Sequence, residues 1–278
     1  MSVKIIVDST VDLTPEIKSQ VKTVPLTVRF GDAEYQDGVT ITPAKFYEML
    51  VASEELPTTS QPTPALFADA FREAVEAGHE VVCITVSSRL SGTYQSATIA
   101  AEEFPGKVFV VDSRTAAIGS GILTEYALQL AAQGMGAGEI LQELMEKRKQ
   151  IRLYAIVDTL EYLKKGGRLN AAVAIVGGML NIKPIITLED GAIQVAAKAR
   201  GMKAAFSQLT QLCGNYGGVD KAMPTLLGYT GSSQENLGKY MAENTQLWPV
   251  DTRATIVAAA IGVHVGPGAV AVSFFSQE

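Results

Sequence analysis

The chain has 278 residues, of which 47% are hydrophobic and 19% charged, and its formal net charge at pH 7 is −6. This length suffices for one large domain or two smaller ones. The acidic balance argues against a general nucleic-acid binder, and the apolar content excludes intrinsic disorder. The two cysteines lie far apart in the sequence, so they form no paired metal motif, and Cys83 is expected to be a buried thiol.

The sequence predicts neither a signal peptide nor a membrane span. Residues 1–12 run directly into a predicted strand without a basic start or an apolar stretch. The most apolar segments, 171–180 and 256–272, are short or interrupted by glycines and by Pro267. We therefore expect a soluble, cytoplasmic protein with no integral membrane segment.

The first half of the chain alternates β-branched runs with helical patterns. Continuous apolar strands between helices are typical of a buried parallel sheet. The helix predicted at 64–77 has Thr63 as a cap, Pro64 in its first turn and Gly78 after its end. The expected elements, in chain order, are a strand at 3–7, a helix at 64–77, strands at 81–86 and 107–111, and helices at 119–133 and 139–150.

The second half groups its strands differently. Residues 185–198 read as a hairpin with Asp190-Gly191 as its turn. Strands are expected at 153–160, 184–189, 192–198, 223–229, 254–261 and 268–274, with helices at 201–213 and 233–245. This pattern favours an α+β domain with a mixed sheet. We predict an N-terminal α/β domain at residues 1–152 and a C-terminal domain at residues 153–278.

The usual signatures of cofactor enzymes and metal sites are absent from the sequence. The glycines of 134–138 follow a helix and lack G-x-G-x-x-G spacing, and Gly238-Lys239 has no phosphate-loop context. No serine lies in G-x-S-x-G, and H-E-x-x-H does not occur. We expect no metal and no cofactor.

Two hydroxyl-rich loops precede predicted helices and are candidate anion sites. They are residues 57–64 and residues 87–93. The N-terminus of a helix offers unpaired N–H donors, and ligands of open α/β sheets bind at the carboxyl ends of the strands. Alternatively, Thr63 and Ser91 are ordinary helix caps. A ligand bound there is expected to carry a carboxylate or phosphate.

His264 is the second candidate, because it ends a predicted apolar strand and opens a glycine turn. It is either a buried histidine satisfied by the backbone, or an imidazole that contacts the anion or acts as a base. The other histidine, His79, reads as a surface loop residue.

A basic segment at residues 164–170 carries three cations beside two glycines, and Arg200 is a second, weaker basic site. The segment is either a solvated turn or a loop that docks an acidic partner or a phosphate. The neighbouring apolar run 171–180 either belongs to the core or lines a cavity.

Taken in order, these motifs resemble the DegV family of bacterial fatty-acid-binding proteins, which includes the binding subunit of fatty acid kinase. The resemblance covers almost the whole chain, and the second and third blocks are its most specific parts. The blocks are Ile6-Val7-Asp8-Ser9, residues 57–62 (PTTSQP), residues 88–97 (SRLSGTYQSA), Val111-Asp112-Ser113, residues 162–168 (YLKKGGR), Lys183-Pro184-Ile185 and residues 264–268 (HVGPG).

The resemblance implies two α/β domains, the first an α/β/α layer with a parallel sheet, with a long-chain fatty acid such as palmitate, stearate or oleate in an apolar tunnel between them. It implies a lipid-binding carrier rather than an enzyme, which presents the fatty acid to a separate kinase subunit for conversion to acyl phosphate. Arg168 and Arg200 would then serve kinase docking or phosphate contact. The implied carboxylate site comprises Thr59, Ser60, Ser91, Gly92, His264 and Gly266.

Two alternatives remain at this point. A hydrolase or small-substrate kinase would use Ser91 or Thr59 as nucleophile and His264 as base. An interaction module would act mainly through the basic segment around Arg168, with the lipid in a structural role.

Overall fold

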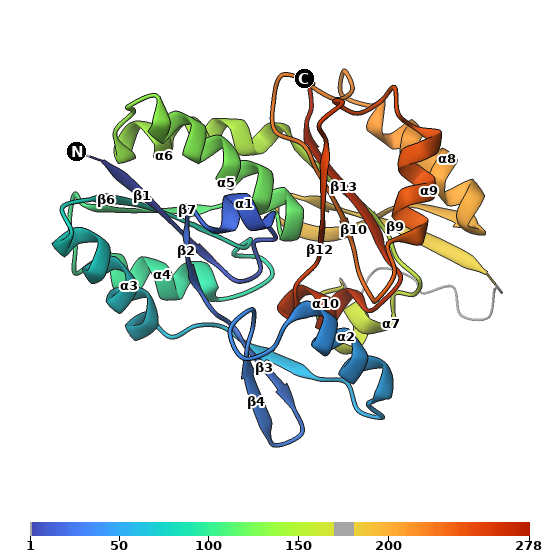
Figure 1. Cartoon of the computed structure of the whole chain (residues 1–278), viewed down its shortest axis with the longest axis horizontal. Coiled ribbons are helices and arrows are strands. Elements are labelled where there is room, and N and C mark those ends of the chain that lie inside the picture. The colour runs from blue at the N-terminus through green and yellow to red at the C-terminus, as the bar shows by residue number, and fades with distance from the viewer. Residues whose placement is uncertain (1, 170–180) are drawn as a thin grey trace.

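Two large β-sheets lie side by side in the computed structural model, which describes residues 2–169 and 181–278 (Figure 1). The N-terminal sheet is parallel, in the order β2-β1-β6-β7. Its strands are β1 (Val3–Asp8), β2 (Lys22–Val24), β6 (Glu80–Thr85) and β7 (Val108–Asp112). The three β-branched runs seen in the sequence are therefore strands, as predicted, and β2 is an additional edge strand.

Helices cover both faces of this parallel sheet. α3 (Pro64–Glu76) and α4 (Thr93–Ala101) pack on one face, and α5 (Ala117–Ala132) and α6 (Ala137–Lys147) pack on the other. Thr63 caps α3 as expected, because its hydroxyl accepts the N–H of Leu66 at 3.4 Å. The N-terminal half is thus the predicted α/β/α layer.

The second sheet is mixed, in the order β10-β9-β8-β13-β11-β12, and only β11 and β12 run parallel. Asp190 and Gly191 both have positive φ angles (48° and 80°) and form the predicted hairpin turn. α8 (Met202–Cys213) and α9 (Glu235–Glu243) contribute to a core on one face of this sheet. The strands are β8 (Ile151–Ile156), β9 (Ile182–Glu189), β10 (Ala192–Arg200), β11 (Leu226–Tyr229), β12 (Arg253–Ile256) and β13 (Val270–Phe275).

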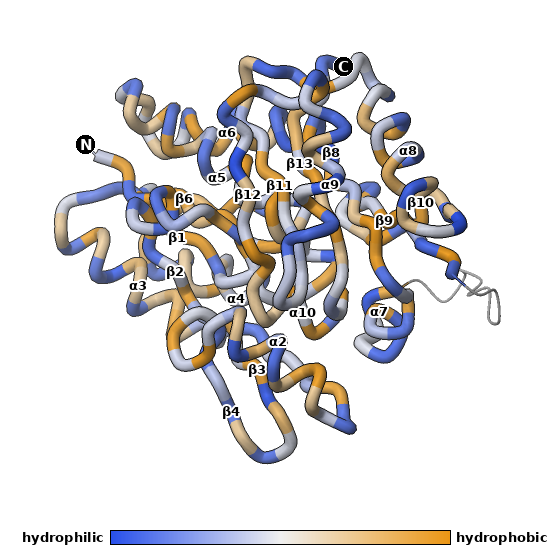
Figure 2. The backbone as a smooth tube through the Cα atoms, turned by 45° about the vertical axis from the view of Figure 1, so that its right-hand side comes forward, coloured by the Kyte–Doolittle hydropathy of each residue, from blue (hydrophilic) through white to orange (hydrophobic). Residues whose placement is uncertain are grey.

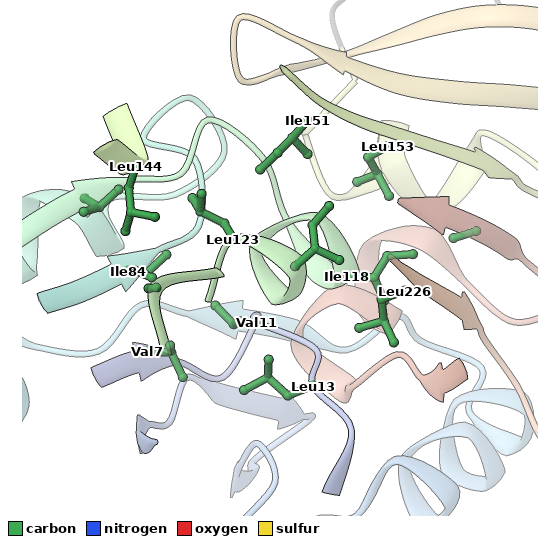
Figure 3. Close-up of a cluster of buried hydrophobic side chains, with 14 of the residues drawn as sticks. Val7, Val11, Leu13, Ile84, Ile118, Leu123, Leu144, Ile151, Leu153 and Leu226 are labelled. Carbon is green, nitrogen blue, oxygen red and sulfur yellow. The ribbon is translucent and has the colours of Figure 1, made fainter. Parts of the chain in front are cut away.

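The largest hydrophobic cluster joins the two sheets. α5 lies between them and contacts β1 and β6 on one side and β8, β11 and β13 on the other. Figure 3 shows Ile118 and Leu123 of α5 between Val7 of β1 and Leu226 of β11. Figure 2 shows where the apolar residues lie along the backbone: in stretches on the strands, and alternating with polar residues along the outer helices. The division into domains at residues 152 and 153 remains a prediction.

A third, three-stranded sheet was not foreseen from the sequence. It has the order β4-β3-β5 and lies below the other two sheets in Figure 1. Its strands are β3 (Thr27–Phe30), β4 (Ala33–Gln36) and β5 (Thr58–Ser60), and α2 (Pro43–Ala52) follows β4. The segment 57–64, expected to be a loop, is therefore partly a strand. This sheet and α2 share a small core with α10 (Ala259–Val265) of the C-terminal half.

The predicted strand at 254–261 is wrong in its second part. β12 ends at Ile256, and residues 259–265 form the helix α10, so His264 lies in the last turn of a helix rather than at the end of a strand. Carboxylates from the N-terminal half accept hydrogen bonds from the first N–H groups of α10, which a local pattern of apolar residues does not reveal.

Two further boundaries differ from the prediction. The strand predicted at 153–160 ends at Ile156, and α7 (Glu161–Lys165) follows, so Lys164 and Lys165 lie in a helix rather than in an exposed loop. The strand predicted at 223–229 begins at Leu226. The short elements α1 (Pro15–Lys18) and η1 (Arg148–Gln150) complete the chain, and the run 171–180 lies outside the described residues. None of the described helices is long and apolar enough to cross a membrane.

Candidate functional site

A cavity of about 370 Å³ lies where the two large sheets and the small sheet meet. Its volume falls in the usual range of small-molecule sites, about 300–1,000 Å³. One group of lining residues is apolar and comes from β8, β9, β10 and β13, namely Leu153, Ala155, Ile186, Leu188, Ile193 and Ala271. A second group is polar and comes from β5, α10 and neighbouring loops, namely Thr59, Ser60, Gln61, Ser91, Arg168 and His264. The lining is therefore chemically asymmetric.

The topology explains why residues from distant parts of the sequence meet here. Thr10 follows β1, Ser91 follows β6, and Ala116 and Ala117 follow β7, and all four line the cavity. The carboxyl ends of neighbouring parallel strands lie at one edge of a sheet, which is the usual place for ligands in open α/β folds. The prediction that the loop at 87–93 reaches a site at this edge is consistent with this geometry.

Thr59 of the hydroxyl-rich segment 57–64 and His264 are in direct contact. The Thr59 Oγ1 and His264 Nε2 atoms are 3.0 Å apart and hydrogen-bonded, although the residues are 205 positions apart in the sequence. Thr59 is held in β5, which pairs with β3, and His264 lies near the end of α10. The bond therefore joins the small sheet to the C-terminal half at the polar end of the cavity.

The imidazole of His264 is neutral at physiological pH. Burial and, to a smaller extent, the positive charge of Arg168 lower its pKa from 6.5 to about 4. Nδ1 is buried and has no hydrogen-bond partner among the described residues. If the proton were on Nδ1, a buried N–H donor would be left without a partner. If it is on Nε2, the ring donates to Thr59 and the unpaired Nδ1 is an acceptor. The Thr59 hydroxyl is then free to donate its own proton to an anion.

Ser91 lies at the polar end but has a different partner. Its hydroxyl is 2.8 Å from that of Thr93 and accepts the Thr93 N–H at 3.3 Å. Gly92 is the cap residue of α4, and a side chain there would collide with Gln61, since a Cβ would lie 2.2 Å from Oε1 of Gln61. Ser91 is therefore not the cap of α4, since Gly92 has that place; its hydroxyl bonds locally to Thr93 and lines the cavity wall.

Two glycines allow a close approach around His264. A Cβ on Gly166, which ends α7, would lie 2.3 Å from His264 Nδ1. Gly266, which ends α10, has φ +74° and lies against the ring of Tyr162. A Cβ at this position would lie only 2.4 Å from that ring. Gly92 and Gly266 are not among the described residues that line the cavity. The contacts that the structure shows for them are with Gln61 and Tyr162, and their predicted part in the carboxylate site remains a prediction.

A second hollow of about 390 Å³ adjoins the first at the Thr59–His264 pair, and we call it the outer hollow because the exposed residues Lys165 and Arg168 line it. It shares Thr59, His264 and Arg168 with the first cavity, and Lys165 and Tyr162 also line it. Arg168 is held by the carbonyl of Leu90, 3.2 Å from its Nε, and by the carbonyl of Gly166. Arg200 is exposed at the end of β10 and lines neither hollow.

Several lining residues were missed in the sequence. Gln61 lines the polar end and donates to Ser96 at 3.0 Å, and its place in the Pro-Thr-Thr-Ser-Gln-Pro segment was a usable signal. Tyr229, the last residue of β11, and Thr230, which follows it, line the cavity, and nothing in the local sequence marks them. His79, in contrast, lies in the loop before β6, as expected. Cys83 and Cys213 are buried free thiols.

Fold and site together define a class of protein: an α/β molecule of two large sheets with an apolar cavity that ends in a hydroxyl–imidazole pair. The family model described as uncharacterised DegV-family proteins matches residues 2–277. The chain belongs to the DegV family.

Relatives from three bacteria illustrate this membership. A DegV domain-containing protein of Deinococcus radiodurans is 38% identical over 279 residues, which cover 98% of each chain. A solved DegV-family structure from Thermus thermophilus, described by its fatty acid binding, is 34% identical with a TM-score of 0.89 and full coverage of both chains. A stearic-acid-binding protein of Eubacterium ventriosum is 28% identical with a TM-score of 0.84, covering 99% of this chain and 98% of its own.

Proposed function

We propose that this protein binds one long-chain fatty acid in the cavity, with the tail against the apolar lining and the carboxylate at the Thr59–His264 pair. The observation that carries the proposal is the chemical asymmetry of the cavity, since a fatty acid has the same asymmetry. The fatty acid binding described for the Thermus thermophilus and Eubacterium ventriosum proteins supports it.

The tail supplies the affinity. Burying about fifteen methylenes contributes about 12 kcal/mol in gross terms, from which the cost of ordering the chain and the protein is subtracted. A predominantly apolar lining imposes no particular position on the chain along the cavity. The orientation of the ligand therefore depends on the polar end.

The head group is held by neutral donors. In the arrangement above, His264 donates to Thr59 and Thr59 donates to a carboxylate oxygen, while Ser91 supplies a second hydroxyl. A carboxylate buried without hydrogen bonds is costly, so these donors decide which end of the ligand enters the polar site. Arg168 adds a positive charge at the rim without being required to clamp the head group.

We further propose that the outer hollow is where a separate kinase subunit reaches the carboxylate. There a carboxylate oxygen would form a bond to the γ-phosphorus of ATP while the bond to the leaving ADP breaks, giving acyl phosphate. Lys165 and Arg168 place positive charge at this opening, which favours a phosphate or an acidic surface. Arg200 is proposed to contact the kinase further out. This chain performs no phosphoryl transfer itself and needs neither metal nor cofactor for its role.

The enzyme alternative is less well supported by the geometry. A nucleophile needs a base within hydrogen-bond reach, which Ser91 lacks, because Ser91 pairs with Thr93 and His264 pairs with Thr59. Thr59 does lie within reach of His264, so for Thr59 the argument rests on the strength of that base. The pKa of His264, near 4, also makes the imidazole a weak base.

The proposal is tested by measuring palmitate binding to delipidated protein, with native mass spectrometry for stoichiometry. Thr59→Val removes the hydroxyl and keeps the shape, so we expect palmitate to bind about tenfold more weakly. Thr98→Val is the matched control, because the Thr98 hydroxyl bonds to the carbonyl of Tyr94 within α4, and we expect a change of less than about twofold. A wild-type protein that takes up no fatty acid would overturn the proposal.

The kinase step is tested separately with palmitate-loaded protein and a purified fatty acid kinase. Arg168→Ala and Arg200→Ala are expected to slow acyl phosphate formation, and because Arg200 lines neither hollow, Arg200→Ala is also expected to leave palmitate affinity unchanged. If Arg168→Ala alters lipid uptake but leaves the binding of the kinase unchanged, the docking role is wrong.

A further inference from the structure

Helix α10 forms the wall of the cavity that carries His264. Ala260, Ile261, His264 and Val265 all line the cavity, and the helix has only seven residues. Such a short helix has few internal hydrogen bonds, so contacts at its ends fix its position. Whatever holds the start of α10 therefore also affects where the imidazole lies relative to Thr59.

Two carboxylates from the N-terminal half hold the start of α10. Asp37 accepts the N–H groups of Ala259 and Ala260, at 3.1 Å on Oδ1 and 3.0 Å on Oδ2. Asp12 accepts the N–H of Ala258 at 2.8 Å. Both aspartates are more than two hundred residues away from α10 in the sequence. Both are buried, with Asp37 1% and Asp12 4% exposed. Anionic acceptors at a helix start satisfy orphan donors and interact favourably with the helix dipole.

Asp37 is itself held in a defined place. Its N–H donates to the carbonyl of Leu26 at 2.9 Å, and Leu26 lines the cavity. Gly38, which follows, has φ +73° and donates to Ile41 at 3.1 Å. The Asp37 carboxylate is thus a fixed support that ties α10 to the loop between β4 and α2.

The charge of this support depends on pH. Burial raises the pKa of Asp37 to about 6 and also raises the pKa of Asp12 well above its ordinary value. The positive charge of Lys18 in α1 lowers the pKa of both carboxyls, and the negative charge of Asp8 in β1 raises the pKa of Asp12. Tyr47 of α2 also faces the pair, and its hydroxyl donates to the carbonyl of Val257, just before α10, at 2.9 Å.

We propose that Asp37 is a positioning residue for fatty acid binding: by accepting two N–H groups of α10 it holds His264 against Thr59, and its protonation loosens this hold. A protonated carboxyl can accept at one oxygen but presents an O–H to the other N–H, so one of the two bonds is lost. The inference rests on the proposed function and adds a pH-sensitive control of the same site. Lipid affinity is expected to fall as the pH drops through the titration of Asp37, before His264 itself becomes charged.

The first test leaves Asp37, Thr59 and His264 unchanged. The chain has two histidines, so a His79→Ala background leaves a single imidazole to follow by NMR. We expect the His264 signals of the apo protein to shift with a midpoint near pH 6, well above the pH at which this imidazole is protonated. Signals that stay constant until His264 itself titrates would overturn the proposal.

The second test compares Asp37→Asn with the wild type in palmitate binding between about pH 7.5 and pH 5. Asparagine keeps the size but replaces one acceptor by a donor, so we expect about fivefold weaker binding at neutral pH and a flattened pH dependence. Asp220→Asn is the control, because Asp220 also accepts a backbone N–H, that of Ala222 at 3.0 Å, but lies away from the cavity. Asp37→Glu keeps the charge and is expected to recover part of the affinity.

The two proposals fail in different ways. A wild type that binds no fatty acid overturns the proposed function. A wild type that binds, together with an Asp37→Asn variant of equal affinity and equal pH dependence, overturns only the role of Asp37. Unequal affinity accompanied by an unchanged His264 signal also overturns it, because the effect would then not act through the imidazole.

Discussion

The two ends of the cavity are built by different means. The apolar end lies on regular strands of the mixed sheet, whose positions follow from long ladders of backbone hydrogen bonds and a large core. The polar end is assembled from short segments of β5, α7 and α10 and the loop after β6, each held by a few specific contacts. A rigid apolar wall and a polar end with few supports suggest that affinity and orientation can be changed separately.

The apolar end gives the largest expected effect. Ala155 of β8 lies opposite Ile186 and Ala271 in the sheet and lines the cavity, so Ala155→Phe fills the space meant for the tail. We expect palmitate affinity to fall at least about 100-fold, with a smaller loss for a short-chain acid that needs less of the cavity. Thermal unfolding checks that the variant is folded, and an equal loss for short and long chains would contradict the assignment of this end to the tail.

At the polar end, His264 is expected to lower the stability of the protein at acidic pH. Because His264 has a pKa of about 4 in the folded protein and 6.5 when exposed, the unfolded chain binds the proton first as the pH falls. The wild type should therefore lose about 2 kcal/mol of stability relative to His264→Ala as the pH drops from about 6.5 to about 4.

The comparison of these two proteins isolates His264. Asp37 has a raised pKa and contributes in the opposite direction, gaining stability as the pH falls from about 6 towards 3.8, but it is present in both. Denaturant unfolding at a series of pH values measures the difference. A difference that is constant over this range would contradict the buried, neutral imidazole.

Gly166 offers a smaller effect confined to the polar end. A methyl group at this position would lie within 2.3 Å of His264 Nδ1, so Gly166→Ala must displace the ring or α7. We expect palmitate to bind about five- to tenfold more weakly, with the loss largely absent when the same substitution is made in His264→Ala. Additive losses in the double variant would show that Gly166 acts elsewhere.

The same contrast explains what could be predicted from the sequence. The strands of the parallel sheet, the ends of α3 and the Asp190-Gly191 hairpin follow from local patterns, and the structure contains them. The small sheet has strands of three or four residues, which are too short for a clear alternation. Helix α10 was mistaken for a strand because its start is stabilised by carboxylates that are remote in sequence.

The site could be predicted in part for the same reason. Thr59, Ser60, Ser91 and His264 were marked by composition and by family resemblance, and the structure places them around one cavity. Their role as carboxylate ligands remains a prediction. Asp12 and Asp37 gave no signal, because the N–H groups that they hold belong to residues 258–260, which only the tertiary fold brings near.

The most direct test of the account is a crystal structure of the protein with bound palmitate. We expect one carboxylate oxygen within hydrogen-bond distance of Thr59 Oγ1, with the Thr59–His264 bond retained, and the tail along Ala155, Ile186 and Leu188. A fatty acid bound with its carboxylate at the end lined by these residues, or bound elsewhere on the molecule, would contradict the central claim.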